Sequence, residues 1–348
     1  MLKRIENLRS QFDALGVDAV LVTSRTNHRY FTKFDNEDGY LLITKKEAYA
    51  YEDFRYIETA QKLLSPVYTV CQTLNLSSLV TELGIKSLGI EGEHMNVNLY
   101  KSYSDSFGIP LIDVSNAITV MRQVKDEWEI EQIKKAQVIT DLAFEHILGY
   151  LSTDITENDV AAELEYFMRR NGAEDKSFET ISISAEKTSL PHGVPGNTKL
   201  KKGFFTMDFG ATVNGYHSDM TRTVCIGKAD SEMKKLYNTV LSAQLAALDY
   251  IKAGVSCFDA DNIAREIIYK DYEGYFGHSL GHSVGLDIHE TPALSPKSDK
   301  ILLVNHVVTV EPGIYIPGKY GTRIEDLVVV KENGVENLTK SPKELIEL

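Results

Sequence analysis

The spacing of apolar residues in the first third of the chain predicts alternating helices and strands. Apolar side chains from Ile5 to Leu15 recur at helical intervals, and Gly16 ends that pattern. Short apolar runs then predict strands at residues 19–23, 39–44, 48–52 and 86–91. Helical segments separate some of these runs, so residues 1–122 are predicted to form a small α/β domain with a mixed sheet.

The rest of the chain, residues 123–348, predicts a second domain with long helices. One helix begins near Trp128, a second runs from Thr156 to Gly172, and a third runs from Ser231 to Ala253, with Gly254 closing it. Strands are predicted at residues 204–209, 216–226, 307–311 and 324–330. A short polar segment at 121–127 joins the two domains.

The dipeptide Asn214-Gly215 separates two strand-like runs and is typical of a two-residue type I′ turn. In the register that this turn sets, Asp208 faces Thr221, and Asp219 lies two residues before Thr221. Because side chains alternate along a strand, the two aspartates share one face as diagonal neighbours, about 7–8 Å apart at the backbone. A slip of one residue would put them on opposite faces.

Composition and charge narrow the functional classes. Apolar residues make up 43% and charged residues 25% of the 348 positions, as in ordinary globular proteins, and this length suits two domains. The net charge of −13 argues against a nucleic-acid partner. The three cysteines, Cys71, Cys225 and Cys257, form no CxxC pair, which fits a reducing compartment. With neither an apolar membrane span nor a secretory signal in view, we predict a cytoplasmic location without membrane contact.

Four carboxylates and one histidine in the second domain are the candidate site. They are Asp208, Asp219, His282, Glu311 and Glu325. Taken singly, each has an ordinary interpretation, such as a solvated hairpin, a structural histidine or a surface ion pair. Gathered in one pocket, four carboxylates would repel one another, and two divalent cations would cancel their charge. The set therefore predicts a two-metal hydrolytic site.

The segments around these residues resemble the metallopeptidases of the pita-bread fold, which include Xaa-Pro peptidases and methionine aminopeptidases. The two aspartates are 219 − 208 = 11 residues apart, as in that family. The segments HSDMTRT, GHSVGLDIHE, VEPGIY and RIED resemble its ligand segments, and SLPHGVPG, with His192, resembles its PHG segment. The first domain also carries two segments that resemble characteristic segments of the Xaa-Pro peptidases, namely NHRYFTKF and DFRY.

The resemblance implies a fold for both parts of the chain. Residues 1–122 would form a small creatinase-like α/β domain. Residues 123–348 would form a pita-bread catalytic domain, in which helices cover a curved antiparallel sheet. The fold class implied for the whole chain is therefore mixed α/β (α+β).

The resemblance also implies the role of each ligand. Asp208 would chelate one metal ion, Asp219 and Glu325 would bridge both ions, and His282 and Glu311 would complete the second. Manganese is the expected metal, with cobalt or zinc as alternatives, because the donors are rich in oxygen.

Four residues, one of them the ligand Glu311, are implied to act on the substrate or beside the metals. His192 and His289 would contact the substrate carbonyl or move protons; the ordinary alternative is a pair of buried, hydrogen-bonded histidines. Glu311 would take the proton of the attacking water. Arg323 would orient a metal-bound carboxylate and stabilise developing charge.

The implied reaction is hydrolysis of the Xaa-Pro bond at the N-terminus of peptides by a hydroxide that bridges two metal ions. Strict dipeptidases of the family carry arginine where this chain has Ala293, so an aminopeptidase is favoured over a dipeptidase (prolidase). A non-proline aminopeptidase and a catalytically silent peptide-binding homologue are further alternatives. The expected partners are peptides with proline at the second position and a second copy of the chain. The acidic loop 35–38 is a candidate cap for the partner's site, and its ordinary alternative is a solvated turn.

Overall fold

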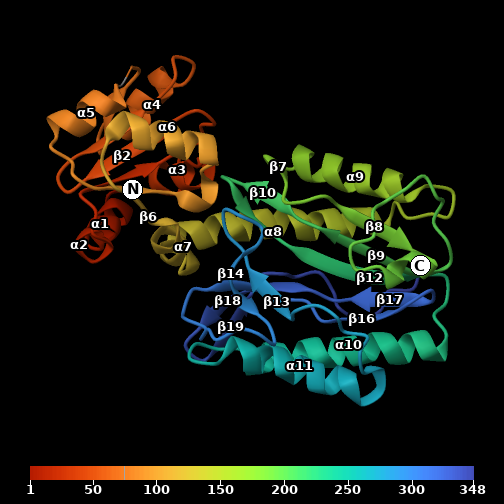
Figure 1. Cartoon of the computed structure of the whole chain (residues 1–348). Coiled ribbons are helices and arrows are strands. Elements are labelled where there is room, and N and C mark those ends of the chain that lie inside the picture. Colours follow the sequence, from red (N-terminus) through yellow and green to blue (C-terminus); the bar gives the residue numbers. More distant parts are fainter. Residues whose placement is uncertain (74) are drawn as a thin grey trace. The chain divides into compact units, whose positions relative to one another are not determined.

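The computed structural model describes residues 1–73 and 75–348, and the chain divides into two compact units (Figure 1). The first unit is Met1–Arg122 and the second is Gln123–Leu348. Within the described residues, no helix is both long and apolar enough to cross a bilayer.

The first unit is built on a six-stranded mixed sheet; the sequence predicts a mixed sheet and four of its six strands. Its order is β4-β3-β2-β1-β5-β6, with β1 antiparallel to β2 and parallel to β5. The strands are β1 (Ala19–Val22), β2 (Tyr40–Thr44), β3 (Ala48–Tyr51), β4 (Thr69–Cys71), β5 (Leu88–Ile90) and β6 (Leu111–Asp113). The helices are α1 (Leu2–Arg9), α2 (Phe12–Leu15), α3 (Arg25–Thr32), α4 (Ile57–Leu64), α5 (Leu76–Glu82), α6 (Val97–Phe107) and α7 (Ser115–Gln123), with a 3₁₀ turn at Gly92–His94. The predicted first helix is therefore two helices, and the second ends at Gly16 in the left-handed conformation (φ 70°).

The second unit packs antiparallel sheets between two helical layers. In Figure 1, α8 (Glu127–Leu148) and α9 (Glu157–Arg170) lie on one side of the strands, and α10 (Ser231–Tyr250) and α11 (Cys257–Tyr272) lie on the other. The sheet orders are β11-β10-β7, β12-β9-β8, β14-β13-β15-β18-β19 and β16-β17. One apolar core lies between α8, α9 and the β9–β12 sheet, and another lies under α10 and α11.

The strands of this unit are short and mostly buried. They are β7 (Asp175–Lys176), β8 (Ile181–Ser184), β9 (Gly203–Phe209), β10 (Ala211–Val213), β11 (Tyr216–His217), β12 (Met220–Ile226), β13 (Gly281–Ser283), β14 (Glu290–Leu294), β15 (Val307–Val310), β16 (Gly313–Ile316), β17 (Tyr320–Arg323), β18 (Asp326–Lys331) and β19 (Gly334–Asn337). A 3₁₀ turn at Ala185–Ser189 follows β8.

Helix α10 ends earlier than the sequence predicts, so the prediction that Gly254 closes it is wrong. Ile251 adopts an extended conformation (ψ 124°), and its side chain is fully buried in the core. The chain therefore leaves the helix at Tyr250. Gly254, with φ 89°, lies in the turn that follows, where its N–H donates to the carbonyl of Leu302.

The hairpin register is as predicted. Asn214 and Gly215 both have positive φ (49° and 77°), as a type I′ turn requires. Asp208 pairs with Thr221 in the β9–β12 ladder. The predicted strand 216–226, however, is interrupted at residues 218–219, and the facing strand is interrupted at Gly210.

The interruption has a steric origin at Gly210. A Cβ atom there would lie 2.0 Å from the carbonyl oxygen of Ser218, so only glycine fits. Ser218 in turn donates its N–H to the carbonyl of Ala211 and accepts the Ala211 N–H at Oγ. Asp219 thus lies in the gap between the β10–β11 pair and the β9–β12 pair.

Two other predicted strands shift by one or two residues. The strand at 307–311 ends at Val310, so Glu311 follows β15, and the strand at 324–330 begins at Asp326. Arg323 is therefore the last residue of β17, and Glu325 lies in the two-residue break before β18.

We expect Gly210→Ala to lower the free energy of unfolding of the second unit by at least about 2 kcal/mol, because the added methyl group overlaps a backbone carbonyl. Gly277→Ala is the matched control, since a Cβ atom there meets nothing within 4 Å. Chemical denaturation of both metal-free variants measures the difference. Equal stability of the two variants would show that the hairpin accommodates a side chain at Gly210.

Candidate metal centre

The five predicted ligands line a single pocket in the second unit. Its volume is about 430 Å³. The other lining residues are Phe178, Glu179, Ile181, Pro191, His192, His278, Ser279, Gly281, Ile288, His289, Ala293 and Arg323. The structure thus brings together every site residue predicted from the sequence.

Strand ends and strand breaks position the ligands. Asp208 is in β9, where alternate residues pack against α8 and α9, so its side chain lies on the opposite face. Asp219 immediately precedes β12, Glu311 follows β15, and Glu325 precedes β18. His282 is the central residue of β13. Each ligand is therefore fixed by a hydrogen-bonded strand, and none depends on a long loop.

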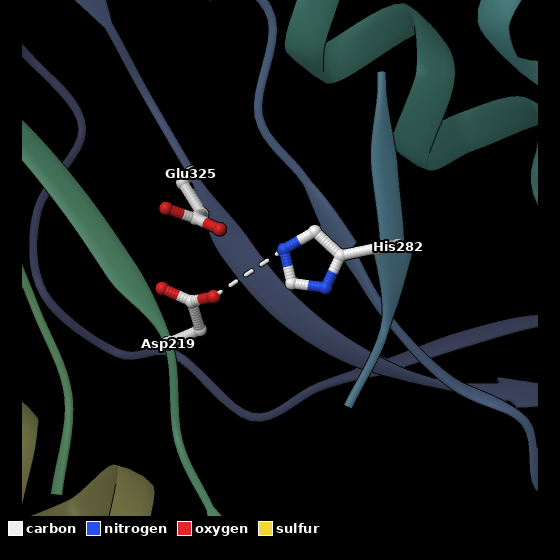
Figure 2. Close-up of side chains that lie close together, drawn as sticks. All are labelled: Asp219, His282 and Glu325. Carbon is white, nitrogen blue, oxygen red and sulfur yellow. Dashed lines mark ion pairs between the residues drawn. The ribbon is translucent and has the colours of Figure 1, made fainter. Parts of the chain in front are cut away.

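Three ligands converge closely. Asp219, His282 and Glu325 each offer one ligand atom, and these atoms all lie within 4.8 Å of one another. Figure 2 shows the three side chains pointing toward one another from three separate backbone segments. His282 Nε2 lies 3.6 Å from Asp219 Oδ2 and 3.4 Å from Glu311 Oε1.

Asp208 carries an unpaired buried oxygen. Its Oδ2 accepts a hydrogen bond from Arg323. Its Oδ1 is buried and has no hydrogen-bond partner within the described part of the chain. A buried polar atom without a partner is costly, and a bound cation would remove that cost by coordinating the oxygen. This oxygen points to a ligand supplied from outside the chain.

Arg323 organises the hydrogen bonds around the carboxylates. It is nearly fully buried and donates to Asp208, to Thr221 Oγ1 (2.9 Å) and to the Tyr315 hydroxyl (2.8 Å). Thr221 Oγ1 donates its own proton to Glu325 Oε2 at 2.7 Å. One guanidinium therefore orients two of the four carboxylates, one of them through a threonine hydroxyl.

A further hydrogen bond extends this network to His278. Because His278 Nδ1 donates to the Ser279 carbonyl (2.8 Å), its Nε2 accepts from the Tyr315 hydroxyl (2.9 Å). Burial and the nearby Arg323 charge lower the pKa of His278 to about 3, so this ring is neutral.

Burial and mutual repulsion raise the pKa values of three carboxyls. Burial, then Asp208 and Glu311, hold the pKa of Asp219 well above its usual range. Burial, then Asp219 and Glu311, do the same for the pKa of Glu325. Burial raises the pKa of Glu311 to about 7, although Arg323 opposes the shift. Burial and the adjacent His289 lower the pKa of His282 to about 4, which leaves a neutral imidazole.

This donor set fits divalent metal ions. Four carboxylates share one guanidinium, so the fully ionised cluster keeps an excess of negative charge in a buried pocket. A neutral imidazole and carboxylate oxygens are the ligands that Mn²⁺, Co²⁺ and Zn²⁺ accept. The unpaired Oδ1 of Asp208 can complete such a site.

The two remaining predicted histidines are exposed, contrary to the alternative of buried, hydrogen-bonded rings. His289 lies between β13 and β14, and its ring packs edge-on against His282 with 4.5 Å between centroids. The next residue, Glu290, accepts the N–H groups of Leu286 and Asp287 and pairs with the buried Lys125 at 3.0 Å. The loop that carries His289 is thus anchored through its neighbour.

Sequence reasoning missed several residues of the pocket and one residue, Tyr315, of the hydrogen-bond network beside it. Tyr315 lies four residues after Glu311 in VEPGIY, and this closeness to a predicted ligand was the only sign in the sequence that Tyr315 lies near the site. Phe178, Glu179 and Ile288 had none, because each lies in an irregular segment whose path depends on tertiary contacts.

Comparison with known proteins identifies the family. Residues 131–332 match metallopeptidase family M24, and residues 4–124 match the creatinase/prolidase N-terminal domain. The chain therefore belongs to metallopeptidase family M24, and the site described above lies within the matched catalytic region. The expected fold class and family are confirmed.

Its relatives are similar over their whole length. An Xaa-Pro dipeptidase of Pyrococcus furiosus is 36% identical, over 99% of this chain and 100% of that protein. Among solved structures, an Xaa-Pro dipeptidase from Bacillus anthracis matches with a TM-score of 0.96 and 43% identity, over 99% of each chain. An X-Pro aminopeptidase from Thermotoga maritima matches with a TM-score of 0.93 and 38% identity, over 99% of this chain and 100% of that chain.

We expect Mn²⁺ binding to release protons at pH 7, because Glu311 has a pKa of about 7 and the pKa values of Asp219 and Glu325 are also raised. Raised carboxyl pKa values mean that protons compete with the metal at low pH. Affinity should therefore rise from pH 6 to pH 8, by about tenfold per pH unit for each proton displaced.

Calorimetry in two buffers of different ionisation enthalpy counts the protons. Glu179→Gln, at a lining residue that is largely exposed, is the control and should leave the count unchanged. Affinity that stays constant from pH 6 to pH 8, without proton release, would contradict the expected competition.

Proposed function

We propose that the protein is an Xaa-Pro aminopeptidase that holds two divalent metal ions in the pocket and removes the residue before proline from peptide N-termini. The observation that carries the proposal is the convergence of four carboxylates and a neutral imidazole around a single guanidinium. Two of its relatives are named Xaa-Pro dipeptidase and X-Pro aminopeptidase, and these names support the Xaa-Pro bond as the bond that this protein would cleave.

The proposed metal ligands are Asp208, Asp219, His282, Glu311 and Glu325, with manganese as the proposed metal and cobalt or zinc as alternatives. Asp208 would hold one ion, His282 and Glu311 would hold the other, and Asp219 and Glu325 would be shared by both. Bound divalent ions supply a hydroxide nucleophile near neutral pH and polarise the scissile carbonyl.

The chain's own residues bind, orient and move protons. Glu311 takes the proton from the attacking water and passes it to the proline nitrogen. His192 and His289 line the pocket and donate hydrogen bonds to the substrate carbonyl oxygen. Arg323 keeps Asp208 in place and offsets the charge that develops.

The charges on the pocket wall favour longer peptides over dipeptides. Among the described lining residues, Arg323 is the only lysine or arginine, and its donors are bound to Asp208, Thr221 and Tyr315. Ala293 offers no charged donor, and Glu179, whose carboxylate pairs with Lys176 at 2.8 Å, offers no positive charge. The free carboxylate of a dipeptide therefore meets no available counter-ion among these lining residues.

The second candidate is an Xaa-Pro dipeptidase with the same ligands. The Bacillus anthracis and Pyrococcus furiosus proteins named as dipeptidases favour it. A non-proline aminopeptidase and a silent peptide-binding homologue are outcomes that the substrate experiment below also detects. The cytoplasmic location and the homodimer stay predictions.

We expect Ala-Pro-Ala to be cleaved with a higher kcat/KM than Ala-Pro, because Arg323, the only lysine or arginine among the described lining residues, is already bonded and leaves no side-chain cation for a carboxylate next to proline. Ala-Pro-NH₂ isolates the charge, since it differs from Ala-Pro only at that group, and should also be the better substrate. Ala-Ala-Ala tests the requirement for proline. A clear preference for Ala-Pro would establish the dipeptidase instead, and rapid cleavage of Ala-Ala-Ala would establish a general aminopeptidase.

Ala293→Arg should shift this preference toward the dipeptide. A guanidinium at the wall can pair with the free carboxylate, and such a charge-assisted contact is worth about 1.5–3 kcal/mol, or roughly tenfold to a hundredfold in the Ala-Pro to Ala-Pro-Ala ratio. Ala293→Gln adds similar bulk without charge and should leave the ratio near that of the parent. A ratio that moves equally in both variants would assign the effect to size.

We expect two Mn²⁺ ions per chain by metal analysis of the loaded protein and about one in Asp208→Asn, because the proposed role of Asp208 is confined to one ion. Asp219→Asn, at a proposed bridging ligand, should lose both ions and nearly all activity. Glu179→Gln, which lies outside the ligand set, should keep two. An unchanged metal content in Asp219→Asn would refute the assigned ligands.

A further inference from the structure

The loop that carries His192 lies at the mouth of the pocket and has an unusual support. It runs from the 3₁₀ turn Ala185–Ser189 to Gly196, and it brings Pro191 and His192 to the pocket wall. The side chain of His192 is exposed. Its ring forms no hydrogen bond to any residue that the structure describes. The position of this histidine therefore depends on the backbone of its loop.

A buried glutamate outside the pocket holds both ends of this loop. Glu157, the first residue of α9, is 1% exposed. Its Oε1 accepts the N–H (2.9 Å) and the hydroxyl (3.3 Å) of Ser184, just before the loop. Its Oε2 accepts Lys187 Nζ (2.6 Å) and the N–H of Gly196 (3.1 Å) at the far end. One carboxylate thus closes the base of the loop with four hydrogen bonds.

Backbone contacts fix the same region to the start of α9. The Asn158 N–H donates to the Gly196 carbonyl (3.1 Å), and the Ser182 hydroxyl donates to the Glu157 carbonyl (3.1 Å). At the tip, a Cβ atom on Gly193 would lie 2.8 Å from Ile183, so the loop packs directly on β8. The loop is therefore held at its two ends and at its tip, and the Glu157 side chain contacts both ends at once.

A second contact ties the loop to the metal centre. Arg323 Nη1 donates to the Pro191 carbonyl at 3.2 Å, one residue before His192. If Glu157 released the base of the loop, this contact would still fix the Pro191 carbonyl but would leave the direction of the neighbouring imidazole open. A displacement of about 1 Å in a group that contacts the reacting atoms can cost about a hundredfold in rate.

We propose that Glu157 is a positioning residue of the peptidase, which acts by clamping the base of the 184–196 loop and so aims His192 at the substrate. The inference rests on the proposed function, in which His192 contacts the substrate carbonyl. Glu157 itself touches neither the pocket nor any proposed metal ligand.

A double-mutant cycle tests this role. Glu157→Gln keeps the size of the side chain, but its amide nitrogen cannot accept the hydrogen bonds now made to one of the two oxygens. We expect it to lower kcat/KM for Ala-Pro-Ala by roughly tenfold to a hundredfold, mainly in kcat, with two Mn²⁺ still bound. In a His192→Ala background, the same change should cost less than about twofold, because the residue on which it acts is already gone.

The matched control is Glu163→Gln on the same helix. Glu163 also loses an ion pair, with His146 Nε2 at 2.6 Å, but it contacts no described part of the loop. It should leave kcat/KM within about twofold of the parent. An equal loss for Glu157→Gln with and without His192 would show that Glu157 stabilises the protein generally, and would overturn the proposal.

Hydrogen exchange of the metal-free protein gives a readout that needs no catalysis. Exchange over residues 184–196 should speed up in Glu157→Gln and stay unchanged in Glu163→Gln. If Glu157→Gln does not fold, Lys187→Gln and Ser184→Ala, which each remove part of the clamp, should give smaller effects of the same kind. Unchanged exchange of the loop would refute the clamp, whereas inactivity of the parent toward Xaa-Pro peptides would refute only the proposed function.

Discussion

Repulsion among four buried carboxylates is the constraint on which the catalytic unit depends. Asp208, Asp219, Glu311 and Glu325 lie in one pocket with a single buried guanidinium, and the pKa values of the last three are all raised. Such an arrangement is energetically unfavourable, because each charged carboxylate loses its hydration and is repelled by the other carboxylates. Rigid strands on both sides of the pocket hold the four groups together nonetheless, which is how a protein prepares a site for a doubly charged ion.

Arg323 shows how the surrounding structure manages this repulsion. It cannot neutralise four charges, but it sets the direction of each group that it reaches. Asp208 is left with one oxygen turned away from the guanidinium, and Glu325 is held through the Thr221 hydroxyl. The tyrosine and histidine beyond it, Tyr315 and His278, extend the same directed set of hydrogen bonds to the pocket wall.

The local chemistry of particular residues explains what the sequence could predict. Asn214-Gly215 requires a specific turn, and that turn sets the register that puts Asp208 opposite Thr221. The end of α10 was not predictable, because burial of Ile251 in the core overrides the signal of Gly254. The breaks at Gly210 and before Glu325 were missed for a similar reason, since they arise from contacts between segments distant in the chain. The roles of Phe178 and Glu157 also depend on loops whose paths follow no periodic pattern.

The five proposed ligands lie in or next to strands of two separate sheets, so a bound metal would connect parts of the chain that are far apart in sequence. Asp208 and Asp219 precede helices α10 and α11 in the chain, whereas His282, Glu311 and Glu325 follow them. Neither half of the unit holds a complete ligand set, so tight binding is available only to a chain that has folded throughout. A ligand that binds the native state alone stabilises it by mass action, in proportion to the logarithm of its concentration over Kd. Metal binding would therefore stabilise only those chains in which both halves of the unit are folded and packed together. It would not stabilise partly folded chains.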